Sequence, residues 1–103
     1  MYIYSRMTDE EIVALAKQGD ESAFTEIFDR YKRIVRLNAG AYFIEGGDPD
    51  DIIQEGMIGL FQAVRDYDAQ NSAGASFNTF ARLCIVRQIS SAIRIASAKK
   101  NSP

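Results

Sequence analysis

The residues best suited to chemistry fall in two runs, and the first run is acidic and polar. It combines acidic and amide side chains spaced i, i+3 and i+4 with three apolar residues that border them, namely Asp51, Gln54 and Glu55, then Met57, Ile58 and Phe61. We expect Gln54 and Glu55 to be exposed. Acidic groups beside exposed apolar ones suit a basic, amphipathic helical partner. A solvated helix face that binds nothing is the alternative that this pattern leaves open.

The second run is basic and aromatic and fills the C-terminal part of the chain. Its members are Phe77, Thr79, Phe80, Arg82, Arg87, Ser91, Arg94, Lys99 and Lys100. Single-stranded DNA is bound by such sets, because rings stack on bases, hydroxyls meet phosphates or base edges, and cations neutralise the backbone. Arg87 and Ser91 are one helical turn apart, so both can point into a groove, where arginine commonly reads guanine. The alternatives are a core role for the two phenylalanines and a solvated basic face.

Catalysis is the least favoured class of function. The chain has no histidine, which excludes histidine bases, histidine triads and His-ligated zinc. Adjacent acids at predicted helix starts are typical of dipole complements rather than of acid–base pairs. The lone Cys84, flanked by Leu83 and Ile85, indicates a packed thiol in a reducing compartment. We therefore expect a protein that is not an enzyme and that holds no metal and no cofactor.

Charge is divided unevenly along the chain. Residues 1–68 carry seven Lys or Arg and all fourteen Asp or Glu, whereas residues 69–103 carry five Lys or Arg and no acid. Such a division indicates two partners of opposite charge, with the basic end as a natural contact for phosphate groups. A surface that is merely uneven is the alternative.

Both runs must be positioned by helices, which the spacing of caps and apolar residues predicts. A capping box that begins at Thr8 predicts a helix from about 9 to 18, and Gly19 predicts its end. Asp20 then caps a second helix, which runs to about Phe43 and carries an apolar stripe at helical spacing.

The two runs themselves lie on a third and a fourth helix. Asp48 and Pro49 predict the start of the third helix, which extends to about Tyr67. After a loop, Ser76 caps the fourth helix, and residues 99–103 form a polar tail that leaves it.

Two glycines, Gly56 and Gly59, lie inside the third helix. Each costs about 0.8 to 1 kcal/mol relative to alanine, so something must approach the backbone closely there. Packing against another helix of the chain and contact with an external partner both explain them.

We expect one all-α domain, a compact bundle of about four helices that spans residues 1–103 and is ordered from about 8 to 98. With 103 residues, 47% of them hydrophobic, the chain has the proportions of a single soluble globular domain. It contains no apolar run long enough to span a bilayer, and its first residues lack a signal-peptide layout. These features predict a cytoplasmic protein without membrane association.

Two segments resemble the second region of the sigma-70 family, the bacterial RNA polymerase sigma factors. The run from Asp51 to Leu60 resembles the family's polymerase-binding helix, and the run from Ser76 to Ile93 resembles its promoter-melting helix. Both match without a gap, and their separation also fits. The stretch 80–89 and the lysine pair that follows most resemble the sporulation-type sigma-H factors.

The resemblance implies a non-catalytic specificity subunit that binds core RNA polymerase and that recognises and helps melt the promoter minus-ten element. The third helix would dock on the clamp coiled coil of the largest polymerase subunit through Asp51, Gln54, Glu55, Met57 and Phe61. The fourth helix would hold the nontemplate strand, and its strand-melting positions are Phe77, Thr79 and Phe80. Arg87 and Ser91 fall where the family reads the upstream edge of the element.

The chain also departs from the family pattern. Leu83 and Cys84 stand where housekeeping sigma factors have a tryptophan pair, which implies weaker melting or a stricter promoter. The resemblance covers about residues 8–102 and not the family's later domains, so we expect a fragment that does not recognise a complete promoter alone. An anti-sigma factor is a further candidate partner. The alternative from another class is a helical protein-interaction adaptor or regulator without DNA binding.

Overall fold

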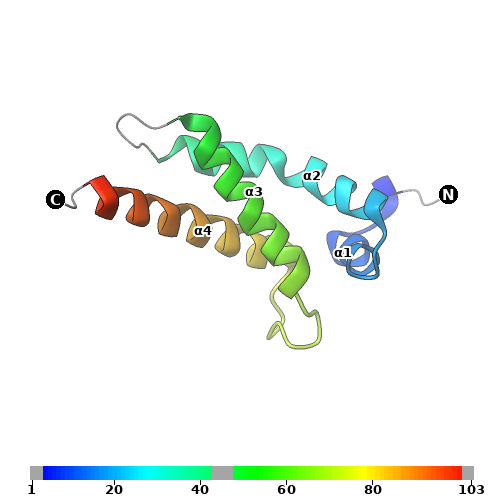
Figure 1. The fold of residues 1–103 in the computed structure, drawn as a ribbon. Coiled ribbons are helices and arrows are strands. Elements are labelled where there is room, and N and C mark those ends of the chain that lie inside the picture. Colours follow the sequence, from blue (N-terminus) through cyan, green and yellow to red (C-terminus); the bar gives the residue numbers. More distant parts are fainter. Residues whose placement is uncertain (1–3, 43–47, 101–103) are drawn as a thin grey trace.

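Four α-helices make up the described part of the chain. A computed structural model describes residues 4–42 and 48–100, of which 99 and 100 are placed by their backbone. The elements are a single 3-10 turn, η1 (Tyr4–Arg6), and the helices α1 (Asp9–Lys17), α2 (Glu21–Gly40), α3 (Pro49–Asp66) and α4 (Phe77–Lys100). Among these residues there is no strand, and none of the helices is both long and apolar enough to cross a membrane. The prediction of an all-α bundle of about four helices is confirmed (Figure 1).

The helix starts follow the predicted local chemistry. Thr8 forms the predicted capping box with the backbone and side chain three residues further on. Asp20, Asp48 and Ser76 accept backbone N–H groups at the starts of α2, α3 and α4. Gly19, at a φ of +99°, turns the chain between α1 and α2 in a conformation that favours glycine.

Two helix ends differ from the predicted ones. α2 ends at Gly40 rather than at about Phe43, which lies outside the described residues. α4 continues to Lys100, so the predicted tail is wrong for residues 99 and 100, whereas 101–103 lie outside the described residues. The helix continues because alanine and lysine have high helix propensity and no glycine or proline interrupts this stretch.

α3 packs against both α2 and α4 and crosses them obliquely (Figure 1). A Cβ added at Gly56 would lie 2.6 Å from Val35 Cγ1, and one added at Gly59 would lie 2.7 Å from the Cys84 carbonyl oxygen. The two glycines therefore allow close packing of α3 on its neighbours. The alternative that an external partner approaches them is wrong.

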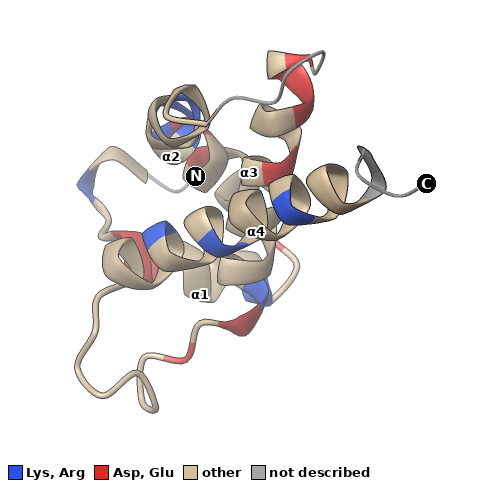
Figure 2. Ribbon diagram, turned by 90° about the vertical axis from the view of Figure 1, so that its left-hand side faces the viewer, with Lys and Arg blue, Asp and Glu red and all other residues tan. Residues whose placement is uncertain are grey.

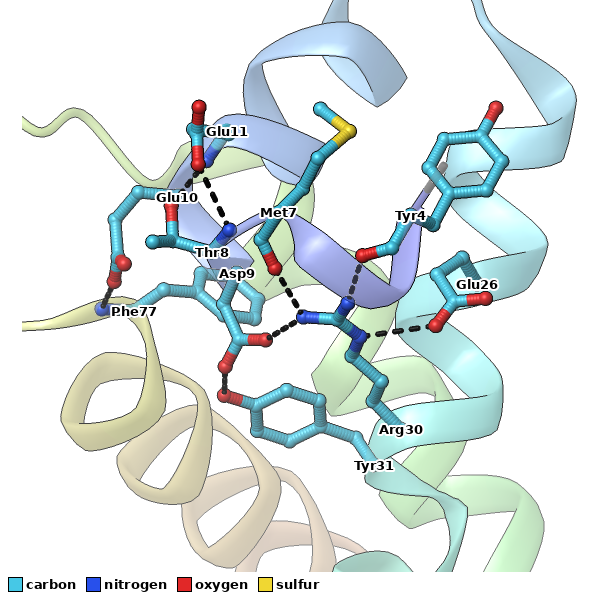
Figure 3. Close-up of polar contacts among 10 residues, drawn as sticks. All are labelled: Tyr4, Met7, Thr8, Asp9, Glu10, Glu11, Glu26, Arg30, Tyr31 and Phe77. Carbon is cyan, nitrogen blue, oxygen red and sulfur yellow. Dashed lines mark hydrogen bonds and ion pairs between the residues drawn. The ribbon is translucent and has the colours of Figure 1, made fainter. Parts of the chain in front are cut away.

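α1 is held against the bundle by two residues of α2 (Figure 3). The Arg30 guanidinium pairs with the carboxylates of Asp9 and Glu26 at 3.0 Å each and donates to two backbone carbonyls of the N-terminal segment. Tyr31 donates its hydroxyl to Asp9. Burial, together with this bond, raises the pKa of Tyr31 above its ordinary value, so the phenol stays protonated and remains a donor.

Candidate functional site

The outward side of α3 carries polar and apolar side chains that the sequence placed together. Asp51 and Gln54 are exposed, and Phe61 is 48% exposed on the same side of the helix. Ile58 lies between them and is 45% exposed. The sequence placed it beside the acidic residues, but it was not among the predicted polymerase contacts. Met57 borders this surface but packs against the core. We call Asp51, Gln54, Ile58 and Phe61 the α3 face, whose mixed composition suits docking of a protein.

Glu55 lies at the edge of α3 that meets α4, and it is not freely exposed. Gln88 Nε2 donates to Glu55 Oε2 at 2.8 Å, and the Glu55 side chain is half-buried. The expectation that Glu55 is exposed is therefore wrong, whereas Gln54 is exposed as expected. Beside it, α3 and α4 enclose a groove of about 250 Å³ with an acidic rim and an apolar floor, lined by Asp48, Asp51, Ile52, Glu55, Ile89, Ala92, Ile93 and Ala96.

An aromatic cluster extends the α3 face onto α2. The ring centroid of Phe61 lies 5.5 Å from that of Phe24, which lies 4.9 Å from that of Phe28. Phe24 and Phe28 are half-buried, so the three rings form an apolar strip that reaches from α3 to α2. The i, i+4 spacing of these two residues was visible in the sequence, but it indicated only a core stripe.

The outward side of α4 brings hydroxyl, apolar and cationic groups into one line. Thr79, Leu83 and Arg87 follow one another at four-residue intervals and are exposed, and Arg94 continues the line two turns further on. Figure 2 shows that α4 carries basic residues and no acidic ones, in contrast to the acidic start of α3. We define the α4 face as Thr79, Phe80, Leu83, Arg87, Ser91 and Arg94.

Phe80 and Ser91 lie at the edge of the α4 face and are half-buried. The Phe80 ring is tilted against that of Tyr67, with centroids 5.6 Å apart, so the core fixes it while part of it stays accessible. Ser91 and Arg94 line a shallow groove of about 340 Å³ with Ile95 and Ala98. Lys99 and Lys100 follow in the last helical turn, and their side chains lie outside the described part of the structure.

Phe77 is a core residue. Its side chain is fully buried, and its ring centroid lies 5.4 Å from that of Tyr31 and 5.5 Å from that of Tyr67, in edge-to-face geometry. The prediction that Phe77 contacts DNA is therefore corrected, because no part of its ring is open to a base. The core alternative for this phenylalanine is the one that the structure supports.

Arg82 is exposed but does not belong to the α4 face. It is five residues before Arg87, which places the two side chains about 140° apart around the helix axis. Arg82 Nε donates to Asn78 Oδ1 at 2.8 Å, which holds the guanidinium along its own side of the helix. A ligand that contacts Arg87 therefore does not contact Arg82 from the same side.

The remaining reactive group of the site is the Cys84 thiol. It is half-buried at the contact between α3 and α4, and burial raises the pKa of this thiol, which keeps it protonated. Within the described ranges, no three Cys, Asp or Glu side chains gather closely enough to hold a metal ion. The two faces can therefore bind a partner through charge, hydrogen bonds, ring stacking and apolar contact.

Both faces fall in a segment that known proteins share. Residues 27–98 match the family described as sigma-70 region 2. The chain belongs to the sigma-70 family. The matched range includes all of α3 and most of α4, whereas α1 and the start of α2 precede it.

Individual sigma factors are similar over nearly the whole chain. It is 39% identical over 100 residues to the RNA polymerase sigma-H factors of Bacillus licheniformis and Bacillus subtilis (strain 168), with 97% of the chain and 44% and 45% of those proteins covered. It is 34% identical over 94 residues to the RNA polymerase sigma-B factor of Bacillus anthracis, with 87% of the chain and 36% of that protein covered. The chain therefore spans less than half the length of these relatives.

In this sigma-70 region 2, the side chains of Leu83 and Cys84 point in different directions. These are the two positions expected to differ from housekeeping sigma factors. Leu83 is 46% exposed within the α4 face, whereas Cys84 is half-buried against the core. The α4 face therefore presents one aliphatic side chain at this level, without a ring that could stack on a base.

Proposed function

We propose that this sigma-70 region 2 acts as a non-catalytic module of transcription initiation, which binds core RNA polymerase and the minus-ten element of a promoter. The observation that carries the proposal is the position of the α3 face and the α4 face on two helices packed directly against each other. One face offers acidic and apolar groups, and the other offers a ring, hydroxyls and cations. Both belong to the part of the chain that matches the family.

The α3 face would dock on the clamp coiled coil of the largest polymerase subunit. Ile58 and Phe61 would bury their exposed apolar surface at the centre of the contact, and Gln54 would hydrogen-bond beside them. The acidic groups would meet basic side chains of the partner, since charge complementarity fixes the register of two helices. The remaining predicted contacts are Asp51, which belongs to the face, and Glu55 and Met57, which border it.

The α4 face would hold the opened nontemplate strand. Phe80 would stack on a base, supported from behind by Tyr67, and Thr79 would bind a phosphate or a base edge. Arg87 and Ser91 would read bases at the upstream edge of the minus-ten element. Contacts to the phosphate backbone would come from the remaining cations at the end of this helix, Arg94, Lys99 and Lys100.

The contact between α3 and α4 would fix the position of the bound DNA strand relative to the bound polymerase. The helices meet closely at Gly59, and the side chains of Gln88 and Glu55 connect them. A DNA strand on α4 would therefore be held at a fixed distance from a polymerase bound to α3.

Roles that depend on the whole protein are part of the same proposal. The protein would act in the cytoplasm, where bacterial transcription takes place, and the likeness to sigma-H factors suggests a role in a sporulation programme. An anti-sigma factor that covers the α3 face would keep the module from polymerase.

Selection of bound strands from a random DNA pool distinguishes the proposed function from that of a protein adaptor that does not bind DNA. Core RNA polymerase, with and without the chain, is incubated with random single-stranded DNA, and the retained strands are sequenced. We expect the chain to add one enriched family of sequences that polymerase alone does not select. An unchanged set of strands, with the chain bound to polymerase, would identify an adaptor and contradict the DNA-binding half of the proposal. Absence of binding to polymerase would contradict the other half.

A further inference from the structure

The short helix α1 contacts both ends of the loop that joins α3 to α4. Glu10 Oε2 accepts the backbone N–H of Phe77, the first residue of α4, at 2.7 Å (Figure 3). Lys17 Nζ donates to the backbone carbonyl of Tyr67, directly after the end of α3, at 2.7 Å. The loop between these two points is therefore anchored to α1 at both ends.

The two anchors come from one side of α1. Glu10 and Lys17 are seven residues apart, so their side chains share a face of the helix. Both side chains line a groove of about 130 Å³ between α1 and the loop, together with Val13, Ala14, Tyr67, Asp68 and Ala69. The charges suit their positions, because a carboxylate is favourable at the positive start of α4 and an ammonium at the negative end of α3.

α1 is itself fixed firmly enough to act as an anchor. Ile12 and Val13 are buried in the core, and Asp9 is paired with Arg30 and bonded to Tyr31 of α2. α1 is therefore fixed to α2, and from this position it contacts the end of α3 and the start of α4.

We propose that Glu10 and Lys17 are positioning residues, which fix the first turns of α4 and so present Thr79 and Phe80 to the DNA strand. This inference rests on the proposed function of the α4 face and assigns a role to a helix outside the matched range 27–98. Without Glu10, the amide of Phe77 loses its acceptor and the first turn of α4 frays. Binding of DNA must then reorder that turn, which lowers the affinity for the strand.

Amide hydrogen exchange of the chain alone tests the structural step. In Glu10→Ala, we expect the Phe77 amide to exchange at least about tenfold faster, the lower end of the range that corresponds to losing one hydrogen bond to a charged group. Glu10→Gln should lie closer to the wild type, because its amide oxygen can still accept. Glu11→Ala is the matched control, since it removes the neighbouring carboxylate of α1, which accepts from the backbone N–H of Thr8, the N-cap of α1, and not from α4. Unchanged exchange at Phe77 in Glu10→Ala, or equal changes in both alanine variants, would overturn the proposal.

Strand binding by the assembled polymerase complex tests the functional step. The probe is a fluorescein-labelled strand enriched from the random pool by the wild-type complex. Glu10→Ala and Lys17→Met should weaken its binding at least about threefold, with unchanged affinity of the chain for core polymerase, whereas Glu11→Ala and Lys32→Met should not. Equal strand affinity of wild type and Glu10→Ala would overturn this inference alone. A wild-type complex that enriches no strand would overturn the proposed function, and the inference with it.

Discussion

Gln88 and Glu55 join α4 to α3 through a hydrogen bond of 2.8 Å between Nε2 and Oε2. The bond connects the helix of the α4 face with the helix of the α3 face, so Glu55 belongs to the contact between helices as well as to the edge of the proposed docking surface. A substitution of Glu55 would therefore disturb both helices. Gln54, which is exposed, is the cleaner position at which to test the proposed polymerase binding.

Replacement of Gly59 by alanine should destabilise the fold. The new Cβ would lie 2.7 Å from the Cys84 carbonyl oxygen and 2.9 Å from the Ile85 Cα, and these backbone atoms cannot move aside alone. We expect a loss of about 1 to 3 kcal/mol in the free energy of unfolding, measured by urea denaturation. Gly40→Ala is the control, because a Cβ there meets nothing within 4 Å, and it should be neutral or stabilising by up to about 1 kcal/mol. Equal effects of the two changes would contradict close packing at Gly59.

Glu11 should contribute to stability in a pH-dependent way. The backbone hydrogen bond from Thr8 lowers the pKa of Glu11 below its ordinary value of 4.5. A depressed folded-state pKa stabilises the fold above the unfolded-state value, and this contribution is lost as the pH falls through the folded-state value. Glu11→Gln should therefore lose less stability than the wild type between neutral pH and about pH 3, as followed by thermal unfolding. Parallel pH profiles would contradict a role for the Glu11 charge.

Phe80 should contribute ring stacking to strand binding. Phe80→Leu keeps an apolar side chain without a ring and should weaken binding of a single strand by about 1 to 3 kcal/mol, whereas Phe80→Tyr should bind nearly as well as the wild type. The free energy of unfolding is measured in parallel, because the ring also contacts Tyr67. If the leucine and tyrosine variants bound DNA equally well, Phe80 would be a core residue only.

Arg87 should discriminate between bases. In the assembled complex, Arg87→Ala should reduce the preference at one upstream minus-ten position by about 1 to 3 kcal/mol, measured with strands permuted at each position at fixed salt. Arg82→Ala removes another exposed cation, from a different side of α4, and should leave that preference intact. Lys99→Ala or Lys100→Ala should weaken all sequences alike. An Arg87→Ala loss that is equal for every sequence would make Arg87 a phosphate contact.

The features that the sequence predicted well are local ones. The caps at Thr8, Asp20, Asp48 and Ser76 depend on residues within three positions, so the helix starts could be located from spacing alone. Helix ends were less certain, because propensity and not a stop signal decides how far α4 extends.

Sequence spacing left open the features that depend on tertiary packing, since it allowed both a core role and a DNA contact for Phe77, and both internal packing and an external partner for the glycines of α3. The burial of Phe77, the exposure of Ile58 and the internal role of Gly59 follow from which side of each helix meets its neighbour. The bond from the Phe77 amide to Glu10 joins residues 67 positions apart, a separation that no periodic pattern in one sequence reports. Sequence spacing thus placed the candidate residues on two helices, and packing decided which of them reach the surface.

Binding of core RNA polymerase by the α3 face is tested most directly by an anisotropy titration of the chain, labelled at its N-terminus, with core enzyme. The wild type should bind saturably, and the double variant Gln54→Ala with Phe61→Ala should bind at least about 2 kcal/mol more weakly at unchanged helix content. Leu37→Ala removes a side chain on α2 that is 67% exposed, and it should bind like the wild type. No saturable binding of the wild type, or an equal loss in the Leu37 variant, would contradict the assignment of the α3 face.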